Sequence, residues 1–132
     1  MRLLFDIHVL LWALTDDDRL PKKARTLIED DSNEVFFSLA SIWETEIKHG
    51  LGKMPISGQH LYNRCMGAGY LPIRIEAEHI ALLSTLHRTD TAPKHNDPFD
   101  RIMIVQSRHE DMQFITHDGL LDDYNESHVI TV

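Results

Sequence analysis

The chain has 132 residues, of which 42% are hydrophobic and 26% charged, and both shares are typical of a globular protein. This length suits one domain over residues 1–132, and the composition excludes a fibrous repeat or a disordered chain. The net charge of −8 argues against a nucleic-acid site built on basic residues, unless some carboxylates hold divalent cations that meet the phosphates instead.

The N-terminal segment and the cysteine content indicate the compartment. Asp6 and His8 interrupt the first apolar run, so no signal peptide is indicated. The apolar stretch 9–14 is far shorter than the roughly 20 residues that a membrane-spanning helix needs. Cys65 is the only cysteine and cannot form an internal disulfide. We therefore expect a cytoplasmic protein with no membrane segment.

In the first half of the chain, short apolar runs alternate with segments whose apolar residues recur at helical spacing. The predicted order is strand 3–5, helix 9–14, helix 21–28, strand 35–37 and helix 39–48. Pro21 suits the first turn of the second helix, and Gly50 and Gly52 stop the third.

The second half of the chain continues this alternation. The predicted order is helix 57–66, strand 71–75, helix 76–86, polar loop 88–96, helix 98–110, strand 114–116 and strand 129–132. Ser57 is expected to cap the first of these helices, and Gly67 and Gly69 end it. Strands that alternate with helices imply an α/β fold, with a mostly parallel sheet covered on both faces.

Acidic residues are expected to meet at one edge of that sheet, because ligands bind beyond the carboxyl ends of parallel strands. Asp6 follows the first strand, Asp118 lies two residues beyond a late strand, and Asp100 opens the helix before it. Glu44 lies on the helix after the second strand and can reach the same edge. Clustered carboxylates suit Mg²⁺ or Mn²⁺, which can activate water for hydrolysis of a phosphodiester.

Each of these acids also has a structural explanation. Asp6 can simply end its strand, although a lone acid in so apolar a run is costly without a partner or a metal. Asp100 is favoured by the helix dipole, and Asp118 can cap a loop or a helix. Helical spacing alone does not choose between Glu44 and Glu46.

Other polar residues are expected to serve the fold rather than the site. Asp97 precedes Pro98 and is expected to cap the helix that follows. The histidines, including His95 and His117, lack the spacing of a zinc site, so we expect them at the surface or in loops. The signatures of serine hydrolases, of nucleoside-triphosphate loops and of dinucleotide-binding folds are absent.

Four stretches of the sequence resemble the PIN-domain nucleases, specifically the VapC-like toxins of bacterial type II toxin–antitoxin systems. They are LLFDIHVLLWAL at residues 3–14, FFSLASIWETEIKHGLGKM at 36–54, HNDPFDRIMIVQS at 95–107 and FITHD at 114–118. The resemblance covers nearly the whole chain. It implies a single PIN-like nuclease domain, built as a three-layer sandwich with a central mostly parallel sheet flanked by helices.

The same resemblance implies a metal-dependent endoribonuclease. Its Mg²⁺ or Mn²⁺ ligands would be Asp6, Glu44, Asp100 and Asp118, with Glu44 preferred over Glu46 because it directly follows Trp43. The implied partners are an RNA substrate, a cognate antitoxin that occupies the active-site groove, and a second copy of the chain in a homodimer.

Several residues around these ligands carry further expectations. Ser38 and Thr116 are candidates to orient the site, whereas Lys48 and Arg101 can contact RNA phosphates or serve as solvated helix charges. The family usually carries a small hydroxyl residue after its first aspartate, where this chain has Ile7, so one supporting hydrogen bond is expected to be absent.

Two alternatives to the nuclease remain from the sequence. The first is a catalytically weak PIN scaffold that acts as a protein-binding module, which Ile7 and the acidic balance favour. The second is an aspartate-dependent phosphohydrolase on a similar sheet, but its usual Asp-x-Asp start is absent because position 8 is His8.

Overall fold

In the computed structural model, which describes residues 1–132, five short strands form one all-parallel sheet in the order β3-β2-β1-β4-β5. The strands are β1 (Arg2–Phe5), β2 (Glu34–Ser38), β3 (Leu71–Ile73), β4 (Gln113–Thr116) and β5 (Val129–Thr131). The predicted α/β fold is confirmed, and the sheet is entirely parallel.

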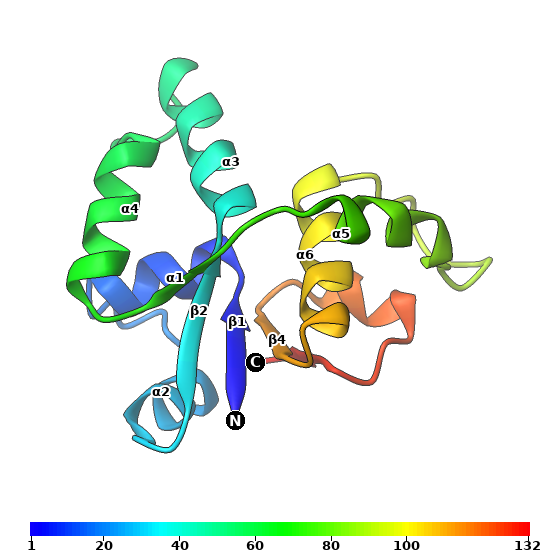
Figure 1. Ribbon diagram of the computed structural model, residues 1–132, viewed down its shortest axis with the longest axis horizontal. Helices are drawn as coiled ribbons and strands as arrows, with labels where there is room; N and C mark the ends of the chain where they lie inside the picture. The colour runs from blue at the N-terminus through cyan, green and yellow to red at the C-terminus, as the bar shows by residue number, and fades with distance from the viewer.

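Helices cover both faces of the sheet. The α-helices are α1 (Ile7–Leu14), α2 (Lys22–Glu29), α3 (Leu39–Gly50), α4 (Gly58–Gly67), α5 (Ala77–Ala81) and α6 (Pro98–His109), and the 3₁₀ helices are η1 (Leu82–Thr85) and η2 (Gly119–Tyr124). Figure 1 shows α1, α2 and α4 on one side of the strands and α5 and α6 on the other. The fold is therefore a three-layer sandwich. None of its helices has both the length and the apolar character needed to cross a membrane.

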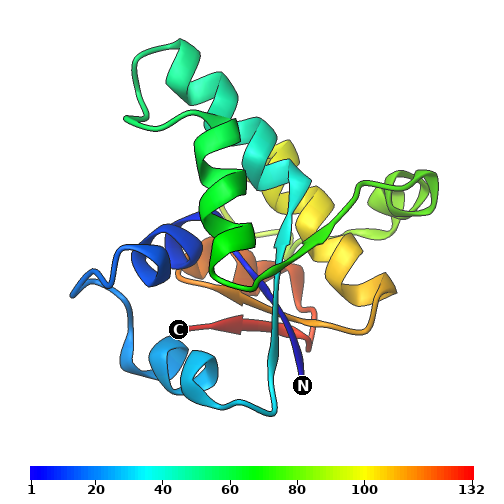
Figure 2. The ribbon, with the colours of Figure 1, turned by 60° about the vertical axis from the view of Figure 1, so that its left-hand side comes forward.

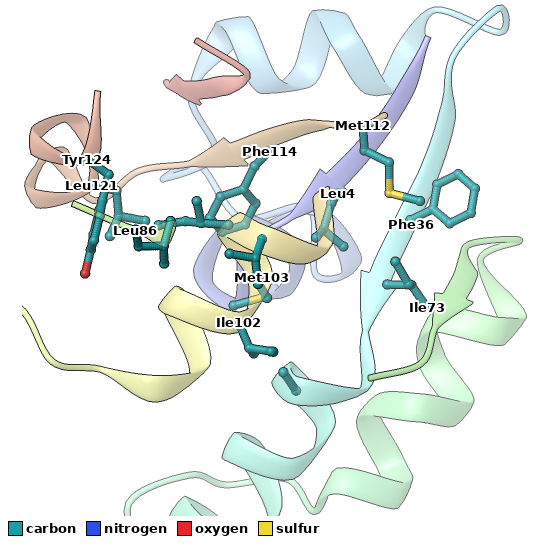
Figure 3. Packing of buried hydrophobic residues seen from close by; sticks show 13 residues of the cluster. Leu4, Phe36, Ile73, Leu86, Ile102, Met103, Met112, Phe114, Leu121 and Tyr124 are labelled. Atoms are coloured by element: carbon teal, nitrogen blue, oxygen red, sulfur yellow. The ribbon is translucent and has the colours of Figure 1, made fainter. Parts of the chain in front are cut away.

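The two faces of the sheet carry separate apolar cores, because successive strand residues point to opposite sides. On one face, Leu4 and Phe114 pack with Met103 of α6, as Figure 3 shows. On the other face, Phe5 packs in a second cluster that includes Leu61 of α4. The three central strands β2, β1 and β4 are largely buried on both faces, which explains why they appear in the sequence as continuous apolar runs.

Helix α4 packs closely along α3, and the two lie side by side in both Figure 1 and Figure 2. Ser57 caps α4 as predicted, with its side chain accepting a hydrogen bond from the backbone N–H of His60 at 3.1 Å. A Cβ atom on Gly58 would lie only 2.7 Å from the carbonyl oxygen of Ile42. Glycine is therefore what allows the first turn of α4 to approach α3 so closely.

Two predicted segments were wrong in extent or kind, and one helix was not predicted. The predicted strand 71–75 ends at Ile73, because the carbonyl of Arg74 turns away to accept a hydrogen bond from Gln106 at 3.1 Å. The predicted helix 76–86 is α5 followed by the tighter η1, whose Leu82 and Leu83 pack against the core beside α6. Helix η2 was not predicted. In the two mispredicted segments a tertiary contact overrides the local apolar spacing.

Candidate functional site

The four acids that the sequence singles out lie at the carboxyl edge of the sheet, where its strand order changes direction. Strand β1 is flanked by β2 on one side and β4 on the other. The carboxyl ends of β1 and β4 therefore border the crevice in which ligands of such sheets bind. Asp6 leaves β1 and Asp118 follows β4, while α3 brings Glu44 and the first turn of α6 brings Asp100.

Asp6 is held in one orientation by two hydrogen bonds. Its Oδ1 accepts from the backbone N–H of Ile7 at 2.7 Å, which caps α1, and its Oδ2 accepts from the hydroxyl of Thr116 at 2.7 Å. The hydroxyl oxygen of Thr116 in turn accepts from the backbone N–H of Asp118 at 3.0 Å. Thr116 therefore links two acids, and both oxygens of Asp6 have a donor although Ile7 offers no side-chain hydroxyl.

Burial and repulsion between like charges raise the pKa values of two acids in this cluster. Burial raises the pKa of Asp6, and the negative charge of Glu44 adds to the rise. Burial, followed by the negative charges of Asp6, Asp97, Glu44 and Asp118, raises the pKa of Asp100 to about 8. A carboxyl group in such surroundings holds a proton at neutral pH unless a cation replaces it.

Glu44 and Glu46 point to different places, which separates two residues that helical spacing left equivalent. The side chain of Glu44 is only 8% exposed, and its Oε2 pairs with the ammonium of Lys48 at 2.9 Å. That ion pair raises the pKa of Lys48. Glu46 is exposed and instead accepts a hydrogen bond from the backbone N–H of Gly58 at 3.0 Å. Glu44 therefore faces the acids, whereas Glu46 faces α4.

Sequence reasoning missed His95 as a residue of the site; it lies in a loop, as expected, but is buried beside the acids rather than exposed. It is buried, with Nε2 3.0 Å from Oδ2 of Asp100 and Nδ1 2.7 Å from the hydroxyl oxygen of Tyr124. Metal-ligating atoms of His95, Asp100 and Asp118 lie within 4.8 Å of one another. Its position five residues before Asp100 was the available signal, but no zinc spacing drew attention to it.

His79 also corrects the expectation that the histidines lie at the surface. Its side chain is fully buried and makes no hydrogen bond to the four acids. Its Nδ1 accepts from the backbone N–H of Glu76 at 2.9 Å, and its Nε2 contacts Glu110 at 2.9 Å. These bonds cap α5 and tie it to the end of α6. His117, in contrast, is exposed as predicted.

Of the remaining candidates, Ser38 and Arg101 make contacts within the protein. The hydroxyl of Ser38 accepts from the backbone N–H of Ala40 at 3.0 Å and donates to Gln106 at 2.7 Å, so it caps α3 without touching an acid. Arg101 donates to the hydroxyl of Tyr124 at 3.3 Å and to the carbonyl of Leu83 at 3.4 Å. Both residues brace the elements that carry the acids.

Asp97 caps α6 as predicted, since its Oδ1 accepts from the backbone N–H groups of Phe99 and Asp100 at 2.8 and 3.2 Å. Asp97→Ala is expected to be less stable than Asp97→Ser by about 1 kcal/mol, because serine can replace the cap and alanine leaves both amides unpaired. Both variants lose the same charge, so their difference in urea denaturation isolates the cap. Equal stability of the two variants would contradict the capping role.

The donor set fits a hard divalent cation. Carboxylates are the ligands that Mg²⁺ and Mn²⁺ prefer, and of the four acids Asp100 and Asp118 have oxygens within 4.8 Å of each other and of His95. The cluster also carries the excess negative charge that keeps a proton on Asp100, and a cation would remove that penalty. These residues therefore fit a divalent cation, and the set of four carboxylate ligands stays a prediction.

The sequence matches the family described as PIN domain over residues 3–126. Among solved structures, the chain is similar to VapBC2 from Rickettsia felis bound to a DNA fragment from their promoter, with a TM-score of 0.65 and 12% identity over 100% of this chain and 98% of that one. It is also similar to FitAcB from Neisseria gonorrhoeae, with a TM-score of 0.58 and 14% identity over 93% of each chain.

A third similar structure is FitAB bound to an IR36 DNA fragment, with a TM-score of 0.61 and 15% identity over 98% of this chain and 93% of that one. At these identities the likeness is one of fold. No curated protein matches the sequence.

Proposed function

Because this chain belongs to the PIN domain family, a family of nucleases, we propose that it is a metal-dependent endoribonuclease that hydrolyses RNA phosphodiester bonds. The observation that carries the proposal is the set of four carboxylates, at one sheet edge, in which the charges of Asp6, Glu44 and Asp118 help to raise the pKa of Asp100. A fold that needed no cation there would gain stability by losing these charges. We propose the whole of residues 1–132 as one nuclease domain.

In this proposal Asp6, Glu44, Asp100 and Asp118 hold the Mg²⁺ or Mn²⁺. Such an ion, when bound, acts as a Lewis acid on a phosphodiester oxygen and makes a water molecule a stronger nucleophile at neutral pH. The protein supplies the orientation. Thr116 keeps Oδ2 of Asp6 in place through its 2.7 Å hydrogen bond.

His95 serves as a positioning residue in this scheme. Its Nε2 contacts Oδ2 of Asp100 at 3.0 Å, while Tyr124 holds the opposite nitrogen of the ring at 2.7 Å. This arrangement fixes the carboxyl of Asp100 and provides a place for its proton when no cation is present. Lys48 fixes the carboxylate of Glu44 through their 2.9 Å ion pair.

Purified protein is expected to cleave a single-stranded RNA in the presence of Mn²⁺ or Mg²⁺ and to lose this activity in EDTA. Asp6→Asn should abolish cleavage, because the amide keeps the size of the side chain but removes the charge that binds a hard cation. Asp31→Asn is a matched control. Asp31 is exposed in the turn before β2, so its substitution removes the same charge far from the cluster. The proposal fails if Asp6→Asn cleaves as fast as Asp31→Asn.

We also propose that the chain is the toxin of a type II toxin–antitoxin pair, with a cognate antitoxin protein as its partner and a homodimer as its assembly. The structural likeness to VapC and FitB toxins of toxin–antitoxin complexes supports this assignment. Ile47 on α3 and Leu51, the residue that caps its C-terminus, are 43% and 65% exposed and offer apolar surface for a partner. A neighbouring gene that encodes a small DNA-binding protein, and whose co-expression relieves growth arrest, would support the pair.

The scaffold alternative predicts partner binding without cleavage. Its support was the missing hydroxyl after Asp6, yet Thr116 and the backbone of Ile7 give both oxygens of Asp6 a hydrogen bond. An intact set of buried carboxylates costs stability and serves no purpose in a pure scaffold. The cleavage assay with Asp6→Asn separates the two functions.

A further inference from the structure

A cleft lies beside the carboxylates, between α1 and the end of β4. This cleft has a volume of about 380 Å³ and is lined by Asp6, His8, Trp12, Arg19, His117 and Asp118. Two of these residues belong to the carboxylate cluster, so a group bound in the cleft lies directly beside the proposed cleavage site. The volume is at the lower end of the range for small-ligand pockets and suits a single nucleoside.

Trp12 is the one apolar side chain of the cleft, and its neighbours there are planar and polar. Its ring centre lies 6.0 Å from that of His8, with the planes tilted by 31°, and 5.4 Å from that of His117 in an edge-on arrangement. The guanidinium carbon of Arg19 lies over the Trp12 ring, 5.7 Å from its centre, so a stacked base would take the place of this side chain or share the ring with it. Trp12 is half-buried, whereas all three neighbours are exposed. An aromatic wall of this kind is what stacks unpaired bases in single-strand binding proteins.

Arg19 and His117 are each anchored by one part of the side chain and free at another. Arg19 donates through Nε and Nη2 to Asp17 at 3.0 and 2.8 Å, which leaves Nη1 without a partner. His117 donates through Nδ1 to the carbonyl of Val132 at 2.6 Å, because a carbonyl only accepts, and its Nε2 stays unpaired. The cleft therefore offers a charged donor and a ring nitrogen to the polar groups of a nucleotide.

We propose that this cleft binds one unpaired nucleoside of the RNA substrate, with its base stacked on Trp12 and its phosphate next to Asp6 and Asp118. The inference rests on the proposed ribonuclease function, which identifies the bound nucleic acid as RNA. It adds where an unpaired base lies relative to the scissile phosphate, because a paired base has no free face for Trp12.

The chain contains two tryptophans, Trp12 and Trp43, which makes base stacking directly measurable by fluorescence. Trp43 lies outside the cleft, where its ring packs edge-on against Phe99 at 5.1 Å. Trp43→Phe leaves Trp12 as the only tryptophan, and Trp12→Phe leaves Trp43. Both variants are made in the Asp100→Asn background, so that the strand stays uncut and the repulsion between protein and RNA is reduced.

A pentanucleotide of single-stranded RNA is the probe, with a strand of the same length that lacks bases as its control. We expect saturable quenching by the RNA in Trp43→Phe, none in Trp12→Phe, and no quenching by the abasic strand in either. Quenching of Trp43 alone, equal quenching by the abasic strand, or no quenching in either variant would each overturn the proposal. Unchanged circular dichroism spectra verify that both variants are folded.

A kinetic measurement in the otherwise unaltered chain distinguishes this inference from the nuclease proposal itself. Trp12→Leu is expected to raise KM for a single-stranded RNA about tenfold with little change in kcat, because one base-stacking contact is lost, and to leave Mn²⁺ affinity unchanged. Trp43→Phe should keep the original KM. Cleavage with an unchanged KM in Trp12→Leu would refute the cleft alone, whereas quenching without any cleavage would refute the nuclease and retain the cleft.

Discussion

Asp100→Asn is expected to lower metal-dependent RNA cleavage by at least about 100-fold. Mutation of a residue that only hydrogen-bonds to a metal ligand typically costs about 10- to 100-fold, and loss of the ligand itself should cost more. The same variant is expected to unfold at a higher temperature than the metal-free parent. Burial, followed by the like charges of neighbouring carboxylates, raises the pKa of Asp100 to about 8, and the neutral amide carries none of that cost. Calorimetric titration with Mn²⁺ and thermal unfolding in EDTA measure the two effects.

Asp97→Ser is the matched control for this variant, because it removes a negative charge three residues away and keeps the cap of α6. It should retain most of the cleavage and of the Mn²⁺ affinity. Equal loss of activity in Asp97→Ser and Asp100→Ser, with both proteins folded, would place Asp97 in the site as well. Undiminished Mn²⁺ binding in Asp100→Asn would remove Asp100 from it.

The metal-free protein is expected to lose stability as the pH rises from about 4 to about 8. Folded Asp100 keeps its proton up to a pKa of about 8, whereas the carboxyl of an unfolded chain loses it near 3.8. Between these values the folded protein holds one more proton than the unfolded chain, so the free energy of unfolding falls with rising pH. For this group the slope is at most about 1.4 kcal/mol per pH unit.

Urea denaturation in EDTA at several pH values tests this slope. His128 and His95, whose pKa values are lowered by burial, contribute in the opposite direction. His128 titrates alike in wild type and Asp100→Asn, so the difference between the two proteins reports on Asp100 together with the His95 ring that contacts it. Mn²⁺ affinity should rise over the same pH range, because the cation must displace the proton. Parallel stability profiles in wild type and Asp100→Asn would show that another group holds the proton.

Local sequence was sufficient for much of the fold because its signals act over a few residues. Apolar runs placed each strand, and the caps Asp97 and Ser57 marked the starts of α6 and α4 correctly. The signals were weaker where a segment depends on distant partners. Residues 82–86 have the apolar content of a helix, yet Leu82 and Leu83 pack beside α6 in a tighter turn.

The carboxylates show the same division. Asp6 stood out in the sequence because a lone acid inside an apolar run requires a partner, and the order of strands and helices was enough to bring it toward Asp100 and Asp118. Helical spacing did not separate Glu44 from Glu46, since the two side chains differ only in which neighbouring element they face. That depends on the packing of α3 between α4 and α6, because Glu46 meets the N–H of Gly58 at the start of α4.

The roles of Thr116 and His95 depended entirely on contacts between distant or locally irregular segments. Thr116 donates to Asp6 across 110 residues, and this pairing exists because β1 and β4 are adjacent in the sheet. His95 lies in a polar loop that carries no periodic pattern, and it is buried only because η2 brings Tyr124 against its ring. Periodicity and capping reflect short-range forces, whereas burial of a polar side chain requires a specific partner that only the folded chain supplies.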